Sequence, residues 1–132
     1  MSPTTSTSPL RVLLVDDAPE LRMLLRALLA DRDDVEVFEA DSGEQALEVA
    51  AAHGPDLVVM DQNMPGMDGV TATRRLREEH RGVEVVAFTA VPGAERQFAE
   101  AGASAHFLKD KFDALIDFIG ERASARGSSA AA

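Results

Sequence analysis

The sequence predicts an α/β fold, a doubly wound parallel sheet of five strands. Strand and helix patterns alternate five times along the chain, the strands are short apolar runs, and the helices carry apolar residues three and four positions apart. Strands that alternate with helices form parallel sheets with right-handed crossovers and helices on both faces. The first and third strands are the most uniformly apolar and the second and fifth the least, which predicts the strand order 2-1-3-4-5.

The first three strands are predicted at residues 11–17, 35–39 and 56–61. The second is interpreted as alternating between apolar and polar residues, which is typical of an edge strand exposed on one face.

Each of these strands is followed by a predicted helix. The first helix covers residues 19–30 and presents a face of leucines. The second has capping-box spacing from Ser42 and extends to about His53, before a Gly-Pro pair. Asp68 is positioned to cap the third, which extends to about His80.

The last two units are predicted to be smaller. Strands at residues 83–90 and 105–109 flank a helix of about two turns at residues 94–101. So short a helix is marginal by itself, so residues 91–101 should be the least stable part of the fold. The last helix has a buried stripe formed by Phe112, Leu115, Ile116 and Ile119. Phe118 lies off this stripe, either as an exposed apolar anchor or within a broader buried face.

The composition describes one domain over residues 10–122, with disordered tails at residues 1–9 and 123–132. The net charge of −10 argues against binding a nucleic-acid backbone. No apolar run is long enough for a membrane span, and no charged and then apolar start indicates a signal peptide. The chain contains no cysteine, which excludes disulfides and thiolate metal sites and fits a cytoplasmic protein.

Acidic residues stand where two buried strands end. Asp16 and Asp17 follow the first strand and Asp61 follows the third, which are the strands that flank the reversal in the predicted order. Clustered carboxylates repel one another unless a cation compensates them. The sequence therefore predicts a site for a metal cation at this edge of the sheet, able to support phosphoryl chemistry.

Over about residues 11–122 the chain resembles the receiver domain of two-component response regulators. The motifs that carry the resemblance are Val15-Asp16-Asp17, Met60-Asp61, Met64-Pro65-Gly66-Met67-Asp68-Gly69, Thr89-Ala90, Ala101-Gly102-Ala103-Ser104 and Leu108-Lys109. Each is weak alone, but their order and spacing are highly specific. The resemblance implies a flavodoxin-like fold and a phosphorelay switch, phosphorylated by a sensor histidine kinase, that is not a turnover enzyme.

The resemblance also implies a role for each site residue. Asp61 matches the phosphoacceptor. Asp17 and Asp61 would ligate Mg²⁺ directly, together with the backbone carbonyl of Asn63, while Asp16 would act through water. Lys109 would pair with the phosphoryl oxygens.

The remaining family positions form the switch. Thr89, with Ala90 beside it, would bind a phosphoryl oxygen and move toward the phosphoacceptor. His106 stands where the family usually has Tyr or Phe, and whether its ring rotates is left open. Asp110 follows the site lysine where the family commonly has Pro. The partner surface is expected on the fourth helix, fifth strand and last helix, with Phe118 as its anchor.

Three alternative functions use related features. An aspartyl-phosphate phosphatase of the haloacid dehalogenase type needs a second Asp two positions after the nucleophile, where this chain has Asn63. A phosphorylation-independent pseudo-receiver is disfavoured because the motif residues are all present. A flavin binder lacks the phosphate-binding loop and any Trp or Tyr to stack on the flavin. The expected partners are a sensor histidine kinase or phosphotransfer protein, a downstream protein or output domain, and a second copy in a homodimer, without nucleic acid or membrane.

Overall fold

The computed structural model describes residues 8–131, including the side chains of residues 8–126. Most of the tail predicted at residues 1–9 lies outside the described residues. In chain order the elements are β1 (Leu10–Val15), α1 (Pro19–Leu29), β2 (Val35–Ala40), α2 (Gly43–His53), β3 (Leu57–Met60), α3 (Gly69–Glu79), β4 (Glu84–Thr89), α4 (Glu95–Ala101), β5 (Ala105–Leu108) and α5 (Phe112–Ala131). The five strands are parallel in the order β2-β1-β3-β4-β5, which confirms the predicted topology.

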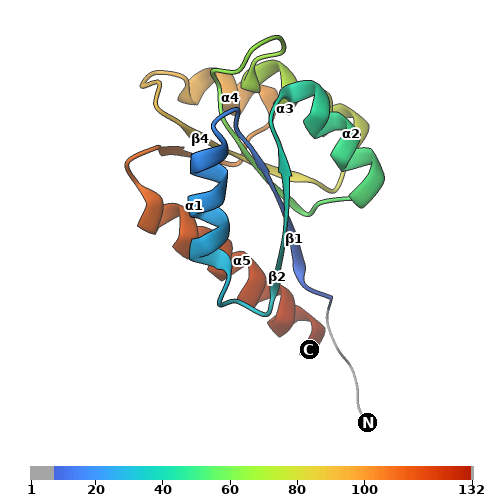
Figure 1. The fold of residues 1–132 in the computed structure, drawn as a ribbon. Coiled ribbons are helices and arrows are strands. Elements are labelled where there is room, and N and C mark those ends of the chain that lie inside the picture. Colours follow the sequence, from blue (N-terminus) through green and yellow to red (C-terminus); the bar gives the residue numbers. More distant parts are fainter. Residues whose placement is uncertain (1–7, 132) are drawn as a thin grey trace.

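Helices cover both faces of the sheet (Figure 1). On one face, Leu29 of α1 and Ile119 of α5 join a buried apolar cluster with the strands. On the other face, Ala50 of α2, Leu76 of α3 and Phe98 of α4 form a second cluster. The central strands β1 and β3 have helices on both sides, and this explains why their sequences are almost continuously apolar.

The edge strand β2 is more covered than its alternating sequence predicted. Only Glu36 is exposed, while the other residues are half-buried or buried. Phe38 stacks on His53 of α2 with ring centroids 4.7 Å apart. On the opposite face, Glu39 is half-buried because arginines from α1 lie against it. The prediction that one face of this strand is exposed is therefore wrong, because helices cover both of its faces.

The predicted helix caps are present in α2 and α3. The Ser42 side chain accepts a hydrogen bond from the backbone N–H of Gln45 at 3.1 Å, and Asp68 accepts one from Thr71 at 2.8 Å. The short helix α4 has no such side-chain cap at its start. It ends at Gly102, whose φ of 111° is readily adopted only by glycine.

Helix α5 is longer than the sequence predicted. A disordered tail was expected from Ala123, but the helix continues to Ala131. Ala123 is buried because it extends the stripe of Leu115 and Ile119 by one more turn. Arg126 then donates hydrogen bonds to Ser8 and lies 3.5 Å from Asp56. These contacts involve residues distant in sequence, so the local Ser- and Ala-rich composition did not reveal them.

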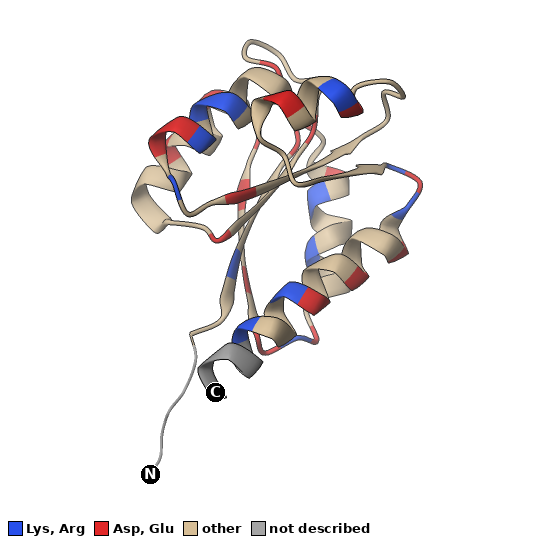
Figure 2. Ribbon diagram, turned by 180° about the vertical axis from the view of Figure 1, so that it is seen from behind, with Lys and Arg blue, Asp and Glu red and all other residues tan. Residues whose placement is uncertain are grey.

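Basic and acidic residues are interspersed along the helices (Figure 2). On α3, for example, Arg75 pairs with Glu79 at 2.9 Å, one turn later. Exposed pairs of this kind contribute at most about 1 kcal/mol each. Within residues 8–131, no helix combines the length and apolarity needed to cross a membrane.

Candidate functional site

Three aspartates meet at the carboxyl ends of β1 and β3. These strands are adjacent and pair Val15 with Met60, so the residues that follow them, Asp16 and Asp61, are brought side by side. One carboxylate oxygen from each of Asp16, Asp17 and Asp61 lies within 4.8 Å of the others. Asp16 and Asp61 are only 4% and 3% exposed, whereas Asp17 is exposed. The cluster therefore opens to solvent on the side of Asp17.

Lys109 reaches this cluster from the end of β5. Its Nζ lies 2.7 Å from Oδ2 of Asp16 and 3.2 Å from Oδ1 of Asp61. Burial lowers the pKa of Lys109, but its hydrogen bond to Asp16 and the charge of Asp61 outweigh this effect, so the pKa is raised. The side chain is therefore a stable ammonium ion at neutral pH.

Asp61 is in a less favourable environment for its charge. Burial raises the pKa of its carboxyl group, and the charge of Asp16 raises it further, while Lys109 and the Gln62 amide act in the opposite direction. The net effect is a raised pKa. A second cation beside Asp61 would relieve this cost.

The donor set fits a divalent cation that prefers oxygen ligands. Three carboxylates face one ammonium group, which leaves excess negative charge in a largely buried place. Mg²⁺ favours this kind of site, with a few carboxylates and remaining positions held by water. Asn63 is exposed in the β3–α3 loop and lines, together with Asp68 and Gln97, a hollow of about 420 Å³ between this loop and the start of α4.

Gly69 fixes the β3–α3 loop against the candidate phosphoacceptor. A β-carbon at this position would lie 1.9 Å from the backbone carbonyl oxygen of Asp61, so no other residue fits without moving the loop. The Gly69 N–H donates to the Gln62 carbonyl at 3.1 Å, and the Gln62 N–H donates to the Asp61 side chain at 2.9 Å. The motif contained this glycine, but its steric reason is visible only in the structure.

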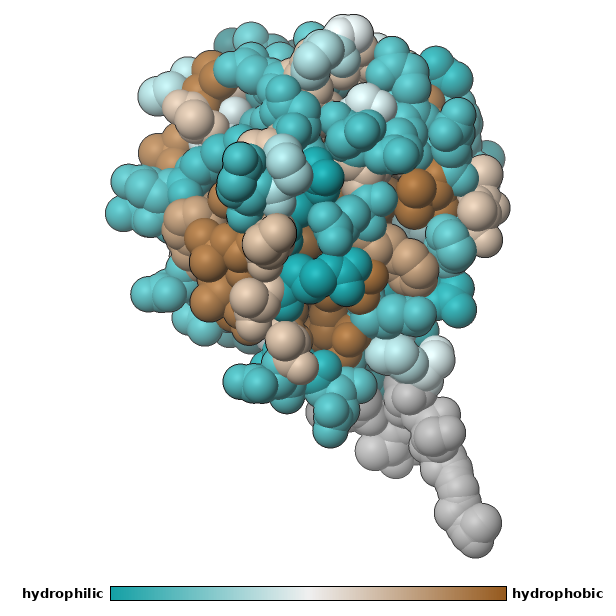
Figure 3. All heavy atoms as spheres, viewed as in Figure 1, coloured by the Kyte–Doolittle hydropathy of each residue, from teal (hydrophilic) through white to brown (hydrophobic). Residues whose placement is uncertain are grey.

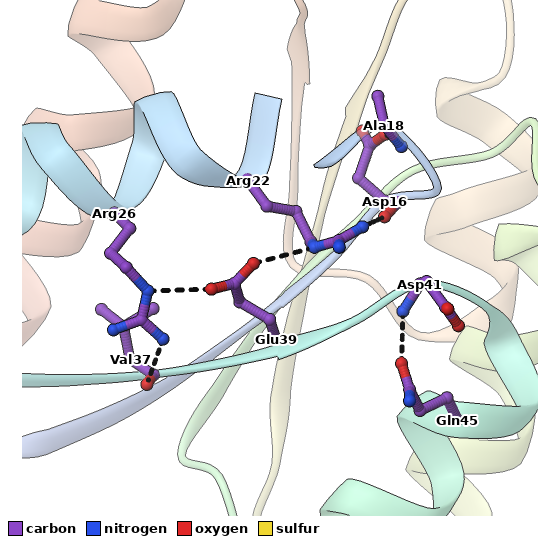
Figure 4. A network of polar contacts seen from close by, with 8 residues as sticks. All are labelled: Asp16, Ala18, Arg22, Arg26, Val37, Glu39, Asp41 and Gln45. Carbon is purple, nitrogen blue, oxygen red and sulfur yellow. Dashed lines mark hydrogen bonds and ion pairs between the residues drawn. The ribbon is translucent and has the colours of Figure 1, made fainter. Parts of the chain in front are cut away.

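The β1–α1 loop is held by residues that the sequence analysis missed (Figure 4). Arg22 of α1 donates to the backbone carbonyl of Asp16 and to Glu39 of β2. The Ala18 N–H donates to Oδ1 of Asp16 at 2.9 Å. The available signal was an arginine one turn into α1 and a glutamate near the end of an edge strand, neither of which is distinctive by itself.

Thr89 and Ala90 lie at the end of β4. The Thr89 side chain is fully buried, and its hydroxyl oxygen accepts a hydrogen bond from the Val91 N–H at 3.2 Å. Ala90 is exposed. In this structure, the hydroxyl that was predicted to bind a phosphoryl group therefore stabilises the turn between β4 and α4.

His106 of β5 packs inward under α4. Its side chain is 13% exposed, its ring centroid lies 6.2 Å from that of Phe98, and its Nε2 lies 3.8 Å from a carboxylate oxygen of Glu95. The imidazole thus occupies the space between β5 and α4.

The sequence left two alternatives for Phe118, an exposed apolar anchor or part of a broader buried face, and the structure favours the second. Phe118 is half-buried, with its ring edge-on to Phe107 at 5.5 Å and the Arg122 guanidinium 4.2 Å above its centre. Among the residues whose side chains are described, the exposed large apolar residues lie instead on α1: Met23 (69% exposed), Leu24 (44%) and Leu28 (45%). Only part of the predicted leucine face of that helix is buried. Apolar side chains gather on this side of the molecule (Figure 3).

Comparison with known proteins gives a family match. The family model described as "Response regulator receiver domain" matches residues 12–119. NarL, the nitrate/nitrite response regulator of Escherichia coli, is 37% identical over 110 residues, which cover 80% of this chain and 50% of NarL. Sporulation initiation phosphotransferase F of Bacillus subtilis is 33% identical over 101 residues, 75% of this chain and 81% of the relative. The chain thus spans about half the length of NarL, but most of the length of sporulation initiation phosphotransferase F.

Solved structures share the fold. A two-component response regulator of the LuxR family from an Aurantimonas species has a TM-score of 0.80 at 32% identity, covering 90% of this chain and 88% of that one. The response regulator TrrA from Thermotoga maritima, in complex with Mg²⁺-BeF, has a TM-score of 0.76 at 28% identity, covering 84% and 96%.

Proposed function

This chain belongs to the response regulator receiver domain family of two-component systems, and we propose that within it Asp61 accepts the phosphoryl group. The observation that carries the proposal is the position of Asp61, at the end of a central strand, with two aspartates beside it and the Lys109 ammonium 3.2 Å away. The alternative of an aspartyl-phosphate phosphatase is not favoured, because the family match covers most of the chain.

The proposed reaction is a transfer between side chains. A carboxylate oxygen of Asp61 attacks the phosphorus of a phosphohistidine, a new O–P bond forms, the N–P bond breaks, and the imidazole leaves with the electron pair. Lys109 pairs with the phosphoryl oxygens, while Thr89 is proposed to leave Val91 and donate its hydroxyl to one of them. The His106 ring is proposed to turn inward behind the moving Thr89. The backbone N–H of Ala90 is proposed to donate to a phosphoryl oxygen.

Mg²⁺ is the proposed cofactor. Asp17 and Asp61 would hold it with the backbone carbonyl of Asn63, and Asp16 would act through water. When bound, the ion neutralises the negative charge that accumulates during phosphoryl transfer. The chain then acts as a switch and not as an enzyme that turns over an external substrate.

Acetyl phosphate with Mg²⁺ tests this assignment. Intact-mass analysis should show one labile phosphoryl group on the wild-type protein, and none on Asp61→Asn. Asp41→Asn, which changes an exposed aspartate after β2, is the matched control and should be labelled like the wild type. Labelling of Asp61→Asn, or labelling in the presence of a chelator, contradicts the proposal. If the wild type is never labelled, the pseudo-receiver alternative is supported.

The proposed docking surface for the phosphodonor protein is α1. This helix begins three residues after Asp16, and its exposed Met23, Leu24 and Leu28 form an apolar strip. Exposed apolar strips on soluble domains often mark protein contacts. Leu24→Ser should slow transfer from an autophosphorylated histidine kinase that phosphorylates the wild type, but leave labelling by acetyl phosphate unchanged. Equal slowing with both donors would indicate a damaged pocket.

The output surface is proposed on α4, β5 and α5. A hollow of about 410 Å³ on this face is lined in part by His106, Lys111 and Ala114. Movement of Thr89 and His106 would change its shape and therefore its affinity for a downstream protein, an attached output domain or a second copy of this chain. Phe118 packs edge-on against Phe107, which lines this hollow, so Phe118→Ser is expected to weaken such binding while phosphorylation persists.

A further inference from the structure

Two arginines of α1 share one glutamate of β2 (Figure 4). Nε of Arg22 lies 2.9 Å from Oε1 of Glu39, and Nε of Arg26 lies 2.8 Å from Oε2. The second hydrogen bond of each arginine differs. Arg22 also donates to the backbone carbonyl of Asp16, whereas Arg26 donates to the carbonyl of Val37 at 3.2 Å. Only Arg22 therefore links this network to the acidic cluster.

The Arg22 side chain is the more buried of the two. It is 15% exposed, compared with 50% for Arg26 and 32% for Glu39. A guanidinium group loses hydration when it is buried, so it is stable there only if charged and polar partners replace the water. Glu39 provides the opposite charge and the Asp16 carbonyl provides a second acceptor.

Every polar group of Asp16 has a hydrogen-bond partner. Its N–H donates to the Ala40 carbonyl at 3.1 Å, its carbonyl accepts from Arg22, and its two carboxylate oxygens accept from the Ala18 N–H and the Lys109 ammonium. The bond from Arg22 comes from outside the loop, and it fixes the peptide group that joins Asp16 to Asp17. The direction of both carboxylates depends on that peptide group.

We propose that Arg22, oriented by Glu39, is a positioning residue that sets the affinity of the acidic cluster for a divalent cation. The inference rests on the proposed function, in which the cluster holds Mg²⁺. If the peptide between the two aspartates is free to turn, cation binding has to order it. The entropy lost in this ordering lowers the affinity for the cation. Residues that hold metal ligands in place typically change metal affinity by about 10- to 100-fold when they are replaced.

Arg22→Lys separates geometry from charge. Lysine keeps the positive charge but lacks the planar fork that reaches Glu39 and the Asp16 carbonyl together. Arg26→Gln is the matched control, because it removes the other arginine on Glu39 without touching Asp16. Glu39→Gln keeps the volume of the glutamate but weakens its hold on Arg22, and provides a second variant if Arg22→Lys fails to fold.

The measurement is isothermal titration of each protein with MgCl₂, without any phosphodonor. We expect a Kd about tenfold higher for Arg22→Lys, a smaller increase for Glu39→Gln, and a change of less than about twofold for Arg26→Gln. At saturating Mg²⁺, labelling of Arg22→Lys by acetyl phosphate should reach the wild-type rate, because the defect is in affinity alone.

The outcomes separate the two proposals. If the wild type binds Mg²⁺ and Arg22→Lys binds it equally well, the positioning role is overturned while the proposed function stands. If Arg26→Gln weakens binding as much as Arg22→Lys, the network acts only through general stability and the inference is also overturned. If the wild type binds no Mg²⁺, the proposed cofactor itself is wrong.

Discussion

The pocket of the candidate phosphoacceptor has two walls that are held in different ways. The first, called here the fixed wall, consists of residues 16–18 and 61–69. It is held by the hydrogen bond from Arg22 to the Asp16 carbonyl, by the contacts of Lys109 with the carboxylates of Asp16 and Asp61, and by the close packing of Gly69 on Asp61. The second, called here the switch segment, consists of residues 89–101. A pocket that must bind a cation and also transmit a signal needs one wall that stays and one that moves.

The helices behind the two walls show the same contrast. The fixed wall leads into α3, which has 11 residues and is capped by Asp68. The switch segment leads into α4, which has seven residues and no side-chain cap. Helix α4 is held mainly by the burial of Phe98 and Ala101. Because apolar contacts are less directional than hydrogen bonds, such a helix can repack at modest cost.

The largest expected effect comes from the one aromatic residue that holds α4. Phe98 is fully buried, so Phe98→Ala should lower the free energy of unfolding by about 3–5 kcal/mol. Phe98→Leu, the conservative control, should cost less than about 1.5 kcal/mol. Urea denaturation monitored by circular dichroism measures both. A loss below about 1 kcal/mol for Phe98→Ala would show that other contacts hold the switch segment.

Hydrogen exchange compares the two walls directly. Amides of residues 91–101 should exchange through openings whose free energy lies at least about 2 kcal/mol below that of β3, because α4 has few polar contacts. Mg²⁺ with beryllofluoride, a phosphoryl mimic, should increase protection in this segment more than in the fixed wall, as expected for an order–disorder switch. Protection of residues 91–101 equal to that of β3 in the free protein contradicts the comparison.

Gly69→Ala tests the rigidity of the fixed wall. The added methyl group would meet the Asp61 carbonyl at 1.9 Å, so the loop must shift, with an expected loss of about 1–3 kcal/mol and much slower labelling by acetyl phosphate. Gly82→Ala is the control, since a β-carbon added there would meet no atom within 4 Å and the stability should change little. If Gly69→Ala is labelled normally, the fixed wall is more adaptable than its contacts indicate.

Asp61→Asn should stabilise the metal-free protein. Burial and the charge of Asp16 raise the pKa of Asp61, so at neutral pH the ionised group is less favourable in the folded chain than in the unfolded one. Removing the charge should therefore raise the free energy of unfolding at pH 7. The difference should shrink as the pH falls through the raised pKa, because wild-type Asp61 then becomes neutral. Thermal melts with and without Mg²⁺ measure this, and a less stable variant at pH 7 refutes it.

The smallest effect concerns an ion pair at the other end of β4. Hydrogen bonds from Arg122 lower the pKa of Glu84 against the opposing effect of burial, and Ser104 contributes as well. A lowered pKa means that the stabilisation is present above the ordinary carboxyl pKa and is lost as the pH falls through the lowered one. Glu84→Gln should cost at most about 1 kcal/mol at pH 7 and nothing in acid. A difference from the wild type that is independent of pH would show that packing, and not charge, is responsible.

The sequence by itself determined the order of the elements, the strand order, the caps at Ser42 and Asp68, and the meeting of Asp16, Asp17 and Asp61. These features depend on local chemistry. Apolar periodicity defines a strand or a helix, capping residues bond within three positions, and parallel strands place their carboxyl ends at one edge. The short length of α4 was predicted for the same reason.

Only the tertiary structure decided how the pocket is held and which apolar residues stay exposed. Arg22 and Glu39 are 17 positions apart, and they meet only because α1 packs beside β2. The extension of α5 and the exposure of Leu24 likewise depend on which neighbours lie opposite each turn. A long side chain can reach many partners, and the sequence pattern around it does not specify which one the fold will bring within a hydrogen bond.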